Sequence, residues 1–63
     1  MKIGEKIKLS REERKITQKE LAKKAGISNT YLSDIERMRT NPSIKVLQQL
    51  ADALEEAISS FLE

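Results

Sequence analysis

Three helix signals lie within the twelve residues from Thr17 to Ser28, so any helix in this segment has to be short. Thr17 and Glu20 have the spacing of a capping box, in which the Thr17 hydroxyl accepts the Glu20 N–H and the Glu20 carboxylate accepts the Thr17 N–H. Gly26 readily takes the left-handed conformation that ends a helix, and Ser28 is a favourable N-cap for the next helix. The segment therefore predicts two helices joined by a tight turn.

Helical spacing extends on both sides of this segment. Ile3, Ile7 and Ser10 follow one helical face up to about Arg14. Ser43 caps a fourth helix, whose apolar stripe consists of Ile44, Leu47, Leu50, Ala51 and Leu54. A last helix carries Ile58, Phe61 and Leu62. We predict an all-α fold of five helices, in one domain over residues 1–63, with a core made of Ile3, Ile7, Ile16, Leu21, Ile27, Leu32, Ile35, Leu47, Leu50 and Leu54.

The sequence contains neither Cys nor His, which removes the usual zinc ligands and the commonest general base. We find no catalytic constellation, and we expect no enzyme activity, no metal and no cofactor. No apolar run approaches the roughly 20 residues that span a bilayer, and the first residues lack the apolar region of a signal peptide. The expectation is a cytoplasmic protein with no membrane partner and no evident small-molecule ligand.

The net charge of +2 hides an asymmetry along the chain. All twelve Lys and Arg lie in residues 1–45 against six acids, which gives +6, whereas residues 46–63 hold four acids and no base, which gives −4. A basic front and an acidic back indicate a polyanion on one side. A Lys- and Glu-rich solvated surface explains the same charges equally well. The choice between the two depends on the motifs.

The helix that follows Ser28 has two different faces at 100° per residue. Leu32 and Ile35 lie on the apolar face. The opposite face carries hydrogen-bonding side chains, most of them short, namely Asn29, Thr30, Ser33 and Arg37, with Asp34 at its margin. Asn can bond adenine, Ser and Thr can bond base edges or phosphate, and Asp can accept from cytosine. An inert solvated face would more often carry Lys and Glu, as the rest of the chain does, so this face predicts contact with DNA bases in a major groove.

These motifs resemble the phage repressor/Cro helix-turn-helix family, also called the xenobiotic-response-element family. The matching blocks are TQKELAKKAGISNTYLSDIER (17–37) and NPSIKVLQQLADAL (41–54), and the similarity runs from Ile3 to Leu62. The resemblance implies a lambda-repressor-like domain in which the helix over about 29–37 is the recognition helix. It also implies base contacts from Asn29, Thr30, Ser33 and, in some members, Asp34. Alternatively, Asp34 pairs with Arg37.

The resemblance further implies a set of contacts to the DNA backbone. Gln18 would bond a phosphate and support the first recognition residue. The loop over 37–41 and the helix after it supply further candidates, which are Arg37, Arg39, Thr40, Asn41 and Lys45. From the residues themselves we add Lys19, on the expected DNA side, and the Tyr31 hydroxyl. Arg11 and Glu36 match a salt bridge that ties the first helix to the end of the third, and we expect it to be structural.

Three positions depart from the family pattern. Lys15 stands where Gly often follows the first helix, and Met38 stands where Gly or Asn often closes the third. If Met38 keeps a positive φ, it carries strain of about 1 kcal/mol. Otherwise the loop differs, and its phosphate contacts change. The run 55–57 (EEA) lacks the family's cap before the last helix, so the turn there is expected to be altered.

One recognition helix reads about four to six base pairs, too few to single out one site in a genome. We therefore expect a homodimer on palindromic double-stranded DNA, with recognition helices about 34 Å apart. The predicted dimer face consists of Ile58, Phe61 and Leu62, unless these residues only close the monomer core.

The sequence thus predicts a DNA-binding transcriptional regulator, with a repressor favoured. An antitoxin or a restriction–modification controller would reuse the same domain. A different class, a protein-interaction bundle that no longer binds DNA, is supported by Asp34 and the low net charge.

Overall fold

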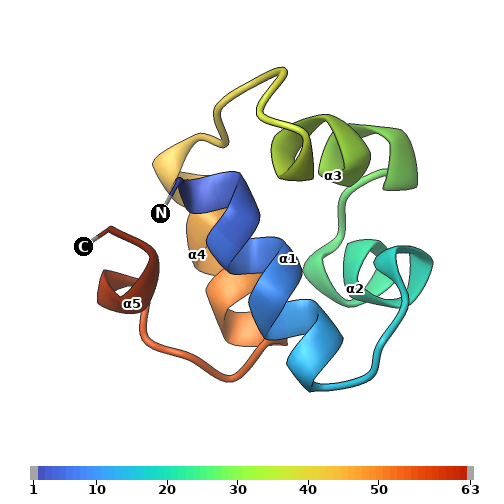
Figure 1. The fold of residues 1–63 in the computed structure, drawn as a ribbon, viewed down its shortest axis with the longest axis horizontal. Coiled ribbons are helices and arrows are strands. Elements are labelled where there is room, and N and C mark those ends of the chain that lie inside the picture. Colours follow the sequence, from blue (N-terminus) through green and yellow to red (C-terminus); the bar gives the residue numbers. More distant parts are fainter. Residues whose placement is uncertain (1, 63) are drawn as a thin grey trace.

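The computed structural model describes residues 2–62 and forms these into five helices, which confirms the predicted all-α fold (Figure 1). The helices are α1 (Ile3–Glu13), α2 (Gln18–Ala25), α3 (Asn29–Glu36), α4 (Ile44–Ala53) and α5 (Ser59–Leu62). In Figure 1, α2 and α3 lie on one side of the molecule and α5 on the other, with α1 and α4 between them. Within residues 2–62, no helix combines the length and the apolar character needed to cross a bilayer.

The core lies where α2 packs on α4 and where α3 packs on α1 and α2. Its large buried side chains come from every helix and from the end of α4, and they are Ile7, Leu21, Leu32, Ile35, Leu47, Leu50, Leu54 and Phe61. Ile3, Ile16 and Ile27, which we expected within the core, are only partly buried at its edge. The predicted core is therefore correct at its centre and too wide at its margin.

Ile44 departs from the predicted apolar stripe of α4, because its side chain is 68% exposed. Leu47 and Leu54 lie near the centre of that stripe on the helical wheel, whereas Ile44 lies at its edge. It is also the first residue of α4, beyond the segment that the core covers. The stripe therefore begins one turn later than its sequence pattern suggests.

The first four helices all end with the same hydrogen-bond pattern. At the end of α3, the Met38 N–H donates to the Ile35 carbonyl (3.1 Å) and the Arg39 N–H donates to the Asp34 carbonyl (2.9 Å). This pair of bonds is a Schellman motif, which places one residue in the left-handed conformation. The residues in that position are Lys15 (φ 56°), Gly26 (φ 74°), Met38 (φ 61°) and Glu55 (φ 57°). Only one of the four is Gly, so three side chains carry strain on the order of 1 kcal/mol each.

Met38 therefore keeps the conformation that the family pattern requires, despite its side chain. Glu55 does the same in the turn after α4, and α5 begins only at Ser59. The turn thus retains its left-handed residue, while the last helix is a single short turn.

Gly4 marks a close approach between the start of α1 and the end of α3. A Cβ at this position would lie 2.2 Å from the Ile35 carbonyl oxygen and 2.6 Å from the Met38 sulfur. The Gly4 N–H donates to that sulfur at 3.2 Å. Helix α1 can rest on the end of α3 only because position 4 has no side chain, a requirement that the sequence pattern did not reveal.

Candidate nucleic-acid interface

The two faces of α3 differ in burial as the sequence predicted. Leu32 and Ile35 are fully buried against the core. On the opposite face Asn29 and Thr30 are exposed, and Ser33 is half-buried. The Ser28 hydroxyl accepts the Tyr31 N–H at 3.0 Å and fixes the start of the helix. The outer face therefore offers small polar side chains on a helix that the core holds in place.

The turn between α2 and α3 depends on two small residues. Gly26 has a φ of 74°, which side-chain-bearing residues rarely adopt. Its N–H donates to the Lys23 carbonyl, and the Ile27 N–H donates to the Ala22 carbonyl. Ala22 is buried where α2 meets its neighbours, and a larger side chain there would push the helices apart. These contacts form a helix-turn-helix with α3 as its second helix.

Asp34 lies at the margin of the outer face and is half-buried. Its carboxylate is 4.0 Å from the Arg39 guanidinium. Because the Arg39 N–H bonds the Asp34 carbonyl, the turn after α3 brings Arg39 back over Asp34. The ion pair seen for Asp34 thus involves Arg39, whereas the alternative drawn from helical spacing was Arg37. The Arg39 side chain is 66% exposed and that of Asp34 is 40% exposed, so solvent screens the pair and it contributes little to stability.

The other candidate DNA-backbone residues surround α3. Lys19 is exposed near the start of α2, and Tyr31 is half-buried against the core. The remaining candidates form an exposed group after α3 and at the start of α4, made of Arg37, Arg39, Thr40, Asn41 and Lys45. The fold therefore leaves the basic side chains of this group accessible beside the outer face of α3.

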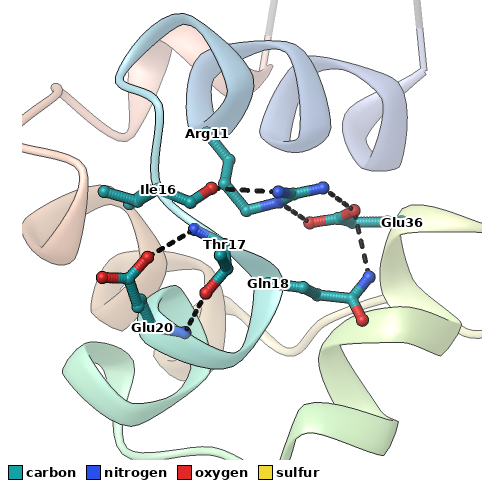
Figure 2. A network of polar contacts seen from close by, with 6 residues as sticks. All are labelled: Arg11, Ile16, Thr17, Gln18, Glu20 and Glu36. Carbon is teal, nitrogen blue, oxygen red and sulfur yellow. Dashed lines mark hydrogen bonds and ion pairs between the residues drawn. The ribbon is translucent and has the colours of Figure 1, made fainter.

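At the C-terminal end of α3, Glu36 accepts hydrogen bonds from two side chains (Figure 2). Arg11 binds its carboxylate through Nε (2.8 Å) and through Nη2 (3.1 Å). The Gln18 Nε2 donates to the same carboxylate at 3.2 Å. Arg11 also donates to the Ile16 carbonyl at 3.0 Å, so the network joins α1, the turn before α2, α2 and α3. The hydrogen bond to Glu36 raises the pKa of Arg11 above its usual value, although burial opposes this.

The predicted capping box of α2 is present beside this network (Figure 2). The Glu20 N–H donates to the Thr17 hydroxyl at 3.0 Å, and the Thr17 N–H donates to the Glu20 carboxylate at 2.8 Å. The backbone hydrogen bond from Thr17, followed by its hydroxyl, lowers the pKa of Glu20 below its ordinary value. The start of α2, and with it Gln18, is therefore set locally.

A second polar cluster also lies near the C-terminal end of α1, and sequence reasoning missed it. Ser10 donates to the Glu56 carboxylate, and Arg14, the residue after α1, forms an ion pair with it at 3.1 Å. Arg14 also donates to the Ser10 hydroxyl at 2.8 Å. Glu56 lies in the turn after α4, far along the chain from Ser10, so no local spacing could have predicted the cluster. A buried Ser on an otherwise apolar helical face was the one available signal.

The predicted dimer residues occupy different environments. Phe61 is only 2% exposed and packs in the monomer core, which is the alternative that the sequence left open for it. Its side chain is large and apolar, and it packs within the hydrophobic core. The chain has only one other aromatic residue that could fill such a position. Ile58 is partly buried, whereas Leu62 is 53% exposed.

Comparison with known proteins places this geometry in a family. A helix-turn-helix family profile matches residues 7–61. The immunity repressor protein of Bacillus phage phi105 is 48% identical over 62 residues, which cover 98% of this chain and 43% of that repressor. The chain spans about half the length of the curated relatives it matches.

Two solved structures show the same fold. The DNA-binding domain of the P22 c2 repressor matches with a TM-score of 0.95 and 35% identity, over 98% of this chain and 82% of that domain. SinR, a master regulator for biofilm formation, was solved in complex with DNA, and it matches with a TM-score of 0.90 and 42% identity over 97% of this chain and 98% of its own. The chain therefore belongs to the phage repressor/Cro type of helix-turn-helix family, which consists of DNA-binding transcription regulators rather than enzymes.

Proposed function

We propose that this chain is the sequence-specific DNA-binding part of a transcription regulator, a repressor being favoured, and that it inserts α3 into the major groove of its operator. The observation that carries the proposal is the contrast between the two faces of α3, a buried apolar face and an exposed face of short polar groups. Short side chains let a helix approach the base edges closely, and their donors and acceptors can distinguish base pairs. A relative at 42% identity that was solved in complex with DNA supports DNA as the partner.

We assign base contacts to Asn29, Thr30 and Ser33, and a further contact at the margin to Asp34. The exposed group over 37–45, together with Lys19 and Tyr31, serves the phosphates. Contacts to phosphates supply affinity and orientation, whereas contacts to bases supply the sequence preference. Residues 1–45, which include this group, carry a net charge of +6, which attracts a polyanion such as DNA.

Two copies would bind one palindromic operator, because a single recognition helix covers too few base pairs for specific binding. The exposed Leu62 and the accessible part of Ile58 are the apolar groups on α5 and just before it that a second copy could cover. Figure 1 shows α5 on the side of the molecule away from α3, which leaves α3 free for DNA.

Selection of binding sites from random DNA tests the proposal directly. The expected result is a short palindrome whose binding weakens steeply as salt rises, because several phosphate contacts release counterions. Asn29→Ala should relax the preference at one position of each half-site, at a cost of about 1–3 kcal/mol. Arg39→Ala should weaken binding to every sequence and flatten the salt dependence. Failure to bind any duplex at about 50 mM salt would overturn the proposal and favour a protein-interaction bundle.

A further inference from the structure

A hydrogen bond to Glu36 directs the Gln18 side chain toward the C-terminal end of α3 (Figure 2). A carboxylate only accepts hydrogen bonds, so the amide atom that faces it has to be the nitrogen. This chemistry fixes the orientation of an amide that could otherwise rotate by half a turn. One N–H of Gln18 is used by Glu36, while the second N–H and the amide oxygen remain for other partners.

Glu36 is itself held in place, so it can act as a fixed anchor for that amide. Two hydrogen bonds from Arg11 grip both carboxylate oxygens, and the Arg11 side chain is fixed in turn by the Ile16 carbonyl. The Glu36 side chain is only 3% exposed. A buried, bidentate arginine–carboxylate pair is among the most rigid polar arrangements in a protein. Gln18 therefore donates to a carboxylate whose position is fixed.

The net charge of the Arg11–Glu36 pair affects how easily a phosphate can approach Gln18. An isolated carboxylate behind Gln18 would repel a phosphate, but Arg11 neutralises it at 2.8 Å. The carboxylate can thus align the amide without opposing an anion on its other side. A neutral acceptor in its place would form a weaker bond to the amide, since hydrogen bonds to charged groups are roughly twice as strong.

We propose that Glu36, backed by Arg11, is a positioning residue for DNA binding, which holds the Gln18 amide with its second N–H ready for a backbone phosphate. The inference rests on the proposed DNA-binding function and adds a role to a pair that otherwise looks purely structural. It predicts that the effect of Glu36 on DNA affinity passes through Gln18, in addition to its effect on folding.

A double-mutant cycle on affinity for the selected operator separates the two roles. Glu36→Gln should weaken binding about threefold to tenfold in the wild-type background. In the Gln18→Ala background the same change should have little further effect, because the amide that Glu36 aligns is gone. Affinities are compared at a temperature at which circular dichroism shows every variant to be folded. Equal effects in the two backgrounds would show that Glu36 acts through the fold alone and would overturn the inference.

Glu56→Gln provides a matched control. Glu56 also pairs with an arginine, Arg14 at the end of α1, and accepts from a second polar side chain, but it lies in the turn after α4. This variant should leave DNA affinity unchanged, with or without Gln18. A loss of affinity equal to that of Glu36→Gln would attribute both effects to general loosening of α1 and would contradict the positioning role.

Nuclear magnetic resonance of the wild-type protein tests the inference without the use of any variant. The two side-chain amide protons of Gln18 should differ in exchange with solvent in the free protein, one being protected by Glu36. On addition of operator DNA the second proton should also become protected. If DNA binds without any change at this proton, the inference is wrong. If no DNA binds at all, the proposed function fails as well, so the two failures are distinguishable.

Discussion

Glu36 and Glu56 hold the same helix by the same means in two very different environments. Glu36 accepts from Arg11 of α1 and from Gln18, whereas Glu56 forms an ion pair with Arg14, just after α1, and accepts from Ser10. The Glu36 side chain is 3% exposed and bound at both oxygens by Arg11, whereas that of Glu56 is 25% exposed and joined to Arg14 by one contact of 3.1 Å. The first pair ties α1 to α3, and the second ties the end of α1 to the turn before α5.

This difference leads us to expect that the burial of an ion pair decides how much stability is lost when one partner is removed. A buried pair adds little net stability when intact, but removing one partner leaves a charge that water cannot reach. An exposed pair is screened, and water replaces a lost partner. Helix α1 should therefore be joined firmly to α3 and only loosely to the C-terminal turn.

The largest expected effect comes from breaking the buried pair. Arg11→Met should lower the free energy of unfolding by about 3–5 kcal/mol, because Glu36 would keep a buried charge with only Gln18 beside it. Arg14→Met, the matched change at the exposed pair, should cost at most about 1 kcal/mol. Urea denaturation of both variants measures the difference. Similar losses for the two would show that burial does not distinguish the pairs.

A backbone contact at the start of α1 should test the join between α1 and α3 without touching a charge. Gly4→Ala places a methyl group where the Ile35 carbonyl lies, so the start of α1 has to move away from the end of α3. We expect a loss of about 1–3 kcal/mol in thermal or urea unfolding. Ala is a better helix former than Gly, so unchanged or increased stability would mean that α1 is not pressed against α3.

The left-handed residues near the two carboxylates should respond differently to substitution by Gly. Glu55→Gly relieves strain beside Glu56 and should stabilise the protein by up to about 1 kcal/mol. Met38→Gly relieves the same strain but removes the sulfur that contacts Gly4, so its gain should be smaller or reversed. Melting temperatures of the two variants test this order. Lys15→Gly serves as a further control, and a greater gain at Met38 than at Glu55 would contradict the role of the sulfur.

The smallest effect concerns Glu20, a third carboxylate that is fully at the surface. Its pKa is lowered in the folded state by the Thr17 backbone bond and then by the Thr17 hydroxyl. A lowered pKa contributes stability at neutral pH that is lost as the pH falls through the folded-state value. Glu20→Gln should therefore flatten the decline of stability as the pH falls through the range in which this carboxylate becomes protonated. Unfolding curves at several pH values measure it, and parallel declines for both proteins would exclude this contribution.

The sequence was sufficient where the relevant signals are local. The capping box at Thr17, the turn at Gly26 and the caps Ser28 and Ser43 all depend on residues within a few positions, and the structure has each of them. The two faces of α3 follow from helical geometry alone. The match of Arg11 with Glu36 came from the family resemblance, since their separation of 25 residues carries no local signal.

The sequence was insufficient where distant segments decide the outcome. The need for Gly at position 4 comes from the Ile35 carbonyl, and the bond between Ser10 and Glu56 spans 46 residues. Phe61 could equally have faced a partner or the core, because the helical pattern around it is only one turn long. Gln18 was assigned to phosphate by resemblance, and its bond to Glu36 became visible only in three dimensions.

The separate faces of α3 have a consequence for how such a chain can change over time. Leu32 and Ile35 carry the packing, while Asn29 and Thr30 touch solvent and contribute nothing to the core. Exchanging the outer residues should therefore leave the fold intact, so new binding preferences can arise by one or two substitutions without compensating repairs elsewhere. One scaffold can in this way give rise to many regulators that ignore each other's sites.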